Sequence, residues 1–282
     1  MIDADSSIGN RKNGLISRYI GSSTNAVRER ESGSTFALTA RENWKTGLHW
    51  PAFQRKETKN MKPHKILIAV PMMSTVCSEF FTSMMAIQTG GYQCQLGVEM
   101  NSLVYEARNR LVLQAIDNKC DYIMWFDSDM VIPPDTLVRL VHWAEEGYDM
   151  VSGLYFARRL PTKPIIAKKL IYEQNMETGE ITHGAEMYYD YPRNDFFEIA
   201  ACGFGCVLTR TSMNLEASEK YMHSPFDPLP SLGEDYSFCY RLSQMGKKIY
   251  CDSSVKCGHV GKITFSERTY EQQQEAGEED GE

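Results

Sequence analysis

Two aspartates that are one residue apart, Asp127 and Asp129, directly follow the apolar run 122–126. In a parallel sheet the ligand site lies beyond the carboxyl ends of the strands, so polar residues at such a point are candidates for chemistry. Carboxylate oxygens bind hard divalent cations, and a bound cation neutralises a diphosphate that departs during group transfer. The position of the pair therefore predicts a divalent metal site, although the same short pattern also occurs in ordinary surface turns.

Two more groups along the chain have side chains suited to the same chemistry. Glu234 and Asp235 stand where a helix is expected, and acidic residues in a first turn interact favourably with the helix dipole. A carboxylate at that place beside a cleft is also able to remove a proton from a hydroxyl. His259 lies between glycines, and imidazole binds Mn²⁺ as well as zinc. For each group the structural and the chemical interpretations stay open.

A zinc site is the alternative use of His259. Cys251 and Cys257 precede it closely, and Cys202 with Cys206 would add further thiolates. The eight cysteines of the chain include no pair spaced two residues apart, and several lie in expected strands, where cysteine acts as a small apolar side chain. We therefore expect reduced thiols and favour zinc less.

Alternating strands and helices must position these groups. Short apolar runs that end at turn residues are typical of strands buried on both faces, whereas apolar residues three and four apart indicate helices. Their alternation predicts an α/β fold with a mostly parallel central sheet flanked by helices. Asn101 or Ser102 is the expected N-cap of the second helix. The expected strands are 66–71, 94–98, 122–126, 150–155, 207–209 and 248–251, with hairpin strands within 163–200, and the expected helices are 77–89, 102–118, 136–146 and 235–245.

Composition indicates the domain organisation and argues against some classes of function. Residues 1–61 are polar and basic, which predicts an N-terminal extension before a domain at 62–265 and an acidic tail at 266–282. The extension is open to interpretation as a partner-binding arm, a poorly ordered segment or upstream sequence. A net charge of -7 argues against nucleic acid as a partner. Without an apolar run of the roughly 18 residues that span a bilayer, or a signal-peptide pattern, we expect no transmembrane segment and a cytoplasmic location.

Taken together, the motifs resemble the glycosyltransferases of the GT-A fold, in particular family 2. The resemblance covers about residues 62–265, and its order is Asp127-Ser128-Asp129, then Ala201-Cys202-Gly203-Phe204-Gly205, then Gly233-Glu234-Asp235, then His259. It implies the GT-A (nucleotide-diphospho-sugar transferase) fold with a smaller β element on the acceptor side. It also implies a Mn²⁺ or Mg²⁺ cofactor and a nucleoside-diphosphate sugar, most commonly a UDP-sugar.

The resemblance also assigns roles to single residues. Asp129 and His259 would bind the metal, Asp127 would contact the ribose or the metal, and Asp235 would be the catalytic base with Glu234 beside it. Looser matches concern the donor pocket. They are Pro71, which resembles the proline that opens the nucleotide pocket, Arg108, which with Asn109 resembles an Arg-Asn pair before the metal motif, Ser128 within that motif, and Gly203 in the loop lining the donor sugar.

The implied reaction moves a hexosyl or N-acetylhexosaminyl unit to a hydroxyl of a carbohydrate, lipid or protein acceptor, with inversion. A retaining GT-A transferase, a sugar nucleotidyltransferase and a non-catalytic module binding nucleotide sugar or zinc are the alternatives. A nucleotidyltransferase normally has a Gly-rich basic loop after its first strand, whereas Pro71-Met72-Met73-Ser74 follows here. The Gln-x-x-Arg-Trp motif of processive synthases is absent after Asp235, so we do not expect a polymer-extruding synthase.

Overall fold

A computed structural model describes residues 63–262 apart from 160 and 176. The expected extension at 1–61 and the expected tail at 266–282 lie outside these residues. Within the described ranges, no helix has the length and apolar character needed to cross a bilayer.

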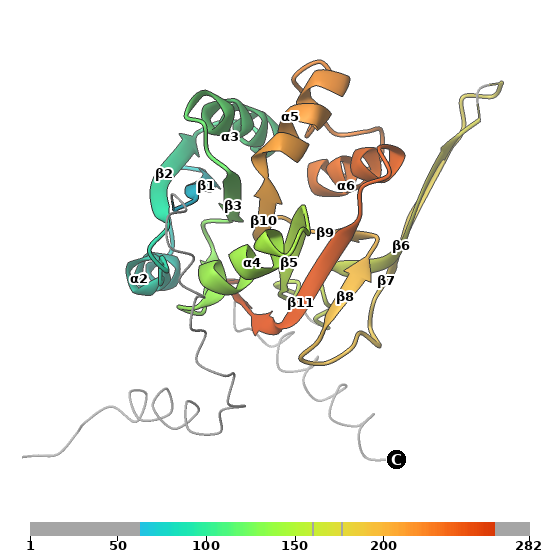
Figure 1. Ribbon diagram of the computed structural model, residues 1–282. Coiled ribbons are helices and arrows are strands. Elements are labelled where there is room, and N and C mark those ends of the chain that lie inside the picture. The colour runs from blue at the N-terminus through green and yellow to red at the C-terminus, as the bar shows by residue number, and fades with distance from the viewer. Residues whose placement is uncertain (1–62, 160, 176, 263–282) are drawn as a thin grey trace, which may run out of the picture. The chain divides into compact units, whose positions relative to one another are not determined.

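A seven-stranded sheet in the order β2-β1-β3-β10-β5-β11-β8 forms the centre of the fold (Figure 1). Strand β1 pairs in parallel with β2 and β3, and β5 pairs in parallel with β11. Only β10 and β8 run antiparallel to their neighbours. The predicted mostly parallel sheet is therefore confirmed. Its strands are β1 (Lys65–Met72), β2 (Gln93–Met100), β3 (Tyr122–Phe126), β5 (Met150–Leu154), β8 (Phe196–Ile199), β10 (Cys206–Arg210) and β11 (Ile249–Lys256).

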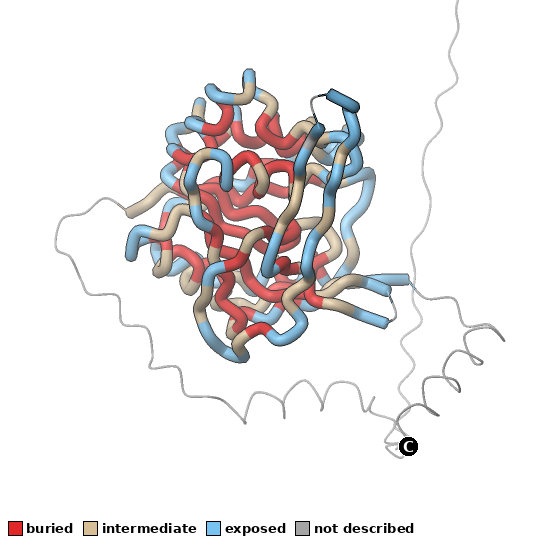
Figure 2. The backbone as a smooth tube through the Cα atoms, turned by 90° about the vertical axis from the view of Figure 1, so that its right-hand side faces the viewer, coloured by how far each residue is buried: buried red, intermediate tan, exposed pale blue. Residues whose placement is uncertain are grey.

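Helices cover both faces of this sheet and create two apolar cores. Strand β3 shows why, because Ile123 and Trp125 point into one core whereas Tyr122, Met124 and Phe126 point into the other. Figure 2 shows the resulting pattern, with the buried backbone inside and exposed segments around it. The first core packs under α3 (Val104–Asp117), α5 (Thr211–Lys220) and α6 (Glu234–Gln244), and the second under α2 (Ser78–Ala86) and α4 (Thr136–Glu145).

Two smaller sheets complete the described fold. A three-stranded sheet in the order β7-β6-β9 contains β6 (Ile166–Gln174), β7 (Ile181–Met187) and β9 (Ala201–Cys202). Its β6–β7 hairpin projects beyond the body of the molecule (Figure 1). The other sheet pairs β4 (Met130–Val131) with β12 (Gly258–His259), which joins the end of the described chain to the turn after β3.

The start of α3 differs from the expectation. Its N-cap is Leu103, and no side chain caps the helix. Asn101 has a positive φ of 58°, a left-handed conformation that asparagine tolerates better than most residues. The chain therefore makes a turn at Asn101, and neither Asn101 nor Ser102 acts as the predicted cap.

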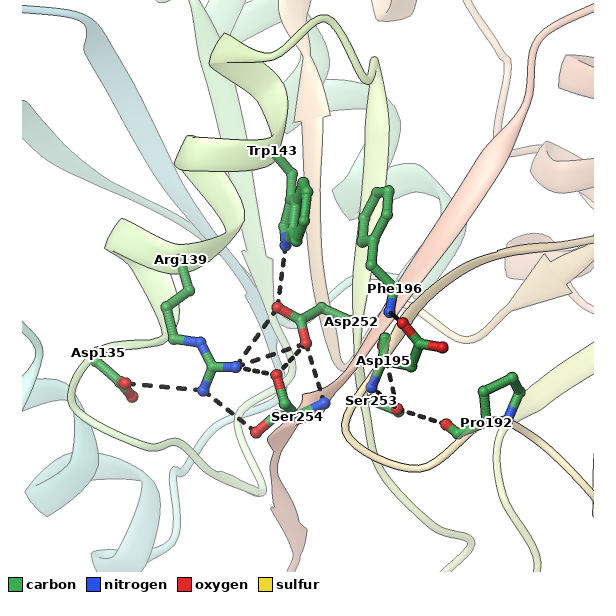
Figure 3. A network of polar contacts seen from close by, with 9 residues as sticks. All are labelled: Asp135, Arg139, Trp143, Pro192, Asp195, Phe196, Asp252, Ser253 and Ser254. Atoms are coloured by element: carbon green, nitrogen blue, oxygen red, sulfur yellow. Dashed lines mark hydrogen bonds and ion pairs between the residues drawn. The ribbon is translucent and has the colours of Figure 1, made fainter. Parts of the chain in front are cut away.

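A polar network fixes β11 against α4 (Figure 3). Asp252 is 2% exposed and accepts a hydrogen bond from the indole of Trp143 at 3.0 Å. The guanidinium of Arg139 lies 3.5 Å from the same carboxylate, and the backbone N–H of Ser254 donates to it at 3.0 Å. Burying a carboxylate costs free energy unless such hydrogen-bond partners are present. The network thereby stabilises the segment that leads from the central sheet to His259.

Candidate active site

The turn after β3 places Asp127 between the central sheet and α3. Its backbone N–H donates to the carbonyl of Gly205 at 3.3 Å, and its own carbonyl accepts from the N–H of Met130 at 3.2 Å. The carboxylate Oδ1 accepts a hydrogen bond from Nη2 of Arg108 at 2.9 Å. Asp127 is thus held by both its backbone and its side chain.

Arg108 is the buried cation of the site. Only 2% of it is exposed, and its guanidinium lies over the rings of Phe204 and Trp125, at 5.2 and 5.8 Å from their centroids. Its Nε lies 3.6 Å from Oε1 of Glu234. Burial lowers the pKa of Arg108, but the charges of Asp127 and Glu234 outweigh this and raise it. Because Arg108 is enclosed, its place suits holding the two carboxylates better than the predicted direct contact with a donor.

Pairing of β4 with β12 brings Asp129 and His259 together, although they are far apart in the sequence. His259 is opposite Met130 in this ladder, and the N–H of Val260 donates to the carbonyl of Asp129 at 2.8 Å. Nε2 of His259 lies 3.5 Å from Oδ1 of Asp129. The Nδ1–H of His259 donates to the carbonyl of Phe156 at 2.9 Å, which fixes the ring with Nε2 toward the carboxylate.

Charge couples these two side chains. The hydrogen bond to Asp129 raises the pKa of His259 above its ordinary value. Burial raises the pKa of Asp129, but the hydrogen bond and charge of His259 and the charge of Arg158 outweigh burial and lower it. Asp129 is therefore an ionised carboxylate beside an imidazole, which is a donor pair suited to a divalent cation.

The described residues contain no group of three or more His, Cys, Asp or Glu side chains arranged around a common metal position. The predicted set of Asp127, Asp129 and His259 is divided, because Asp127 faces Arg108 and the other two face each other. Two atoms bound to one small cation are roughly 3 Å apart, so the 3.5 Å between Asp129 and His259 fits a shared ion. The role of Asp127 as a metal ligand stays a prediction.

Asp235, at the start of α6, has a strongly shifted acidity. Burial, followed by the charge of Glu234, raises its pKa to about 7. The N–H of Tyr236 donates to its Oδ1 at 2.7 Å. Glu234 instead faces Arg108, so the adjacent carboxylates have different surroundings. A carboxylate that titrates near neutral pH is suited to take up a proton during a reaction.

Gly203 and Tyr155 pack closely together beside Asp235. A Cβ on Gly203 would collide with the hydroxyl of Tyr155 and would lie 3.3 Å from Oδ2 of Asp235. The Tyr155 hydroxyl accepts a hydrogen bond from the N–H of Gly205 at 3.1 Å. Burial and the charges of Asp127 and Asp235 raise the pKa of Tyr155 well above its ordinary value, so the hydroxyl keeps its proton. Only glycine at 203 permits this close packing.

The remaining sequence-based candidates are more peripheral. Pro71 is buried inside β1, opposite Glu99 of β2. Ser128 is partly buried in the turn after β3, and its carbonyl accepts from the N–H of Cys77 at 3.4 Å. Neither placement tests their predicted contacts with a nucleotide. The site includes Arg158, which sequence reasoning missed and which forms an ion pair with Asp129.

Comparison with known proteins finds one family that is similar to part of the chain. Residues 101–215 match the family model described as glycosyl transferase family 2. This part of the chain is therefore similar to the family 2 glycosyltransferases. The match extends from before α3 to within α5, so it includes Arg108, Asp127, Asp129 and Gly203. It ends before Asp235 and His259, which the fold brings to the same site.

Two solved structures are similar to this chain. A structure titled "Crystal Structure of A197 from STIV" is 18% identical and aligns with a TM-score of 0.51, covering 70% of this chain and 86% of its own. Another, titled "Crystal structure of GalNAc-T7 with UDP, GalNAc and Mn2+", is 10% identical and covers 71% of this chain and 44% of its own. Its TM-score is 0.48. No curated protein matches this chain in sequence.

Proposed function

We propose that the protein transfers a hexosyl or N-acetylhexosaminyl unit from a nucleoside-diphosphate sugar to an acceptor hydroxyl, with inversion at the anomeric carbon. A UDP-sugar is the first donor to test. The observation that carries this proposal is the site around Tyr155, whose hydroxyl is influenced by the charges of both Asp127 and Asp235 and whose ring lies 5.5 Å from that of His259. His259, which pairs with Asp129, thus lies beside the ring of Tyr155, and Asp235 lies near the Tyr155 hydroxyl at Gly203.

Asp129 and His259 would hold a Mn²⁺ or Mg²⁺ ion. A bound ion there would neutralise charge on the leaving diphosphate. Two protein ligands are sufficient, because Mg²⁺ in phosphate-transfer sites commonly binds one or two carboxylates and takes its other ligands from phosphates and water. The contact between Nδ1 of His259 and the Phe156 carbonyl keeps Nε2 directed at the site.

Asp235 would take the proton from the acceptor hydroxyl as that oxygen attacks the anomeric carbon. Its pKa of about 7 means that an appreciable fraction is ionised at neutral pH while the carboxylate remains basic enough to accept a proton. Glu234 contributes indirectly, because its charge helps to raise the pKa of Asp235 while its carboxylate faces Arg108. Attack by the acceptor opposite the leaving group gives inversion.

The direct test compares two reactions with purified protein and Mn²⁺. The first assay measures nucleoside diphosphate released from UDP-, GDP- and TDP-sugars, and the second measures pyrophosphate released from nucleoside triphosphates with sugar 1-phosphates. We expect release of nucleoside diphosphate from at least one donor and no release of pyrophosphate. The reverse result would identify a nucleotidyltransferase and would refute the proposal.

A further inference from the structure

Arg158 forms an ion pair with the carboxylate that is proposed to bind metal. Its Nη1 contacts Oδ2 of Asp129, while Oδ1 faces His259. Both oxygens of Asp129 are therefore engaged by nitrogen atoms of neighbouring side chains. Arg158 follows β5, so it comes from the carboxyl end of another parallel strand.

The backbone of Arg158 is anchored, whereas its side chain reaches solvent. The loop from Ala157 to Lys163 is closed by the bond from the Ala157 N–H to the Lys163 carbonyl at 2.8 Å, and Thr162 donates to the Ala157 carbonyl at 2.7 Å. Gly261 packs beside it, since a Cβ there would lie 3.0 Å from the Cβ of Arg158. The side chain is nevertheless 57% exposed. Its guanidinium is thus free to change partners while its Cα stays in place.

A diphosphate is a second partner that the guanidinium of Arg158 would bind at this position. An exposed ion pair between arginine and a carboxylate contributes little stability, so separating Arg158 from Asp129 requires little free energy. Guanidinium binds phosphate oxygens through two parallel hydrogen bonds, and the leaving diphosphate would lie against the same carboxylate through the shared cation. A divalent ion and Arg158 compete for Asp129, but they do not compete for a diphosphate, which has oxygens for both.

We propose that Arg158 is an exchangeable diphosphate-binding residue. It occupies Asp129 while the divalent ion is absent, and it turns to the diphosphate when that ion binds Asp129 and His259. The inference rests on the proposed function and adds a residue that sets the order of binding. Arg158 should therefore weaken binding of the metal alone and strengthen binding of the nucleotide to the metal-loaded protein.

The test measures two affinities in four proteins: wild type, Arg158→Ala, Arg158→Lys and the matched control Arg159→Ala, which removes the same charge from the adjacent exposed position. Binding of MnCl₂ alone is followed by electron paramagnetic resonance of the free ion. UDP, GDP and TDP are then titrated calorimetrically into each Mn²⁺-loaded protein. Circular dichroism of each variant checks that the fold is unchanged.

Arg158→Ala is expected to bind Mn²⁺ about threefold to tenfold more tightly and the nucleotide at least about tenfold more weakly, whereas Arg159→Ala stays within about twofold of wild type. Arg158→Lys should keep the Mn²⁺ affinity near wild type and lose about threefold in nucleotide affinity, because lysine lacks the planar fork. Unchanged or weaker Mn²⁺ binding by Arg158→Ala, or unchanged nucleotide binding, would overturn the inference. If wild type binds neither Mn²⁺ nor a nucleotide, the proposed function fails as well. If wild type binds both and Arg158→Ala binds them with the same affinities, only the role proposed for Arg158 is wrong.

Discussion

Asp235→Asn is expected to lower kcat/KM by about 10³-fold, because asparagine cannot accept the proton of the acceptor hydroxyl. In wild type, kcat/KM should rise with pH through an apparent pKa near 7, as Asp235 becomes ionised. The residual activity of the variant should lack this rise. A pH profile of both proteins with the same donor checks the assignment. If the variant keeps the rise near pH 7, another group is the base.

The same substitution should stabilise the folded protein at high pH. The folded-state pKa of Asp235 is about 7 and exceeds the ordinary value, so the folded state binds more protons than the unfolded state between these two values. Its contribution to stability is complete below about pH 4 and is lost as the pH rises through 7. The side chain is partly exposed, so solvent reduces the full effect, and we expect Asp235→Asn to be more stable than wild type by roughly 1–3 kcal/mol at pH 8.

Urea unfolding at two pH values measures this difference. The two proteins should have equal stability near pH 4 and should separate as the pH increases. An inactive but more stable variant is the expected signature of a functional carboxylate kept in an unfavourable environment. A variant that is less stable than wild type at pH 8 would contradict the raised pKa.

Arg108→Met should destabilise the protein by about 2–4 kcal/mol, because it leaves a partly buried carboxylate cluster without its cation. Arg108 is 2% exposed and lies 2.9 Å from Asp127 and 3.6 Å from Glu234. Methionine fills much of the space over Phe204 and Trp125, so the loss of stability comes mainly from the carboxylates that no longer have a cationic partner. Urea unfolding of wild type and Arg108→Met at pH 7 measures the difference in stability.

Removing the carboxylates together with Arg108 provides the control. The triple variant Arg108→Met, Asp127→Asn, Glu234→Gln should recover most of the lost stability, because no unpaired charge remains. Recovery of stability would show that the unpaired carboxylates, and not lost packing around Arg108, cause the destabilisation of the single variant. If Arg108→Met is as stable as wild type, the ion pairs do not compensate for the burial of the guanidinium, and its proposed role as a structural cation is wrong.

Sequence patterns predicted the elements whose apolar runs are continuous. Strand β3 has the predicted bounds, and α4 and β5 each end one residue earlier than expected. The pattern failed where an element is short or polar. Helix α5 (Thr211–Lys220) has a mixed polar sequence, and β4 and β12 have two residues each, so no periodicity was available to reveal them.

The site was predictable only in part, for a related reason. Residue types and the motif order singled out Asp129 and His259, but their proximity depends on the short pairing of β4 with β12, which only the tertiary structure shows. Arg108 of α3 was expected to contact the donor, and its burial against Phe204 and Trp125 depends on tertiary packing that the sequence does not show. Arg158 carries no motif, although its place after a parallel strand is a signal that a search of strand ends would have found.

Release of nucleoside diphosphate by wild type and Asp129→Ala tests the central claim most directly. A panel of UDP-, GDP- and TDP-sugars is incubated with each protein and Mn²⁺, and the released diphosphate is quantified. We predict release from at least one donor by wild type and a loss of at least about 100-fold in Asp129→Ala, because the variant lacks the carboxylate that holds the ion. No release from any donor, or equal release by the two proteins, would contradict a metal-dependent glycosyltransferase centred on Asp129.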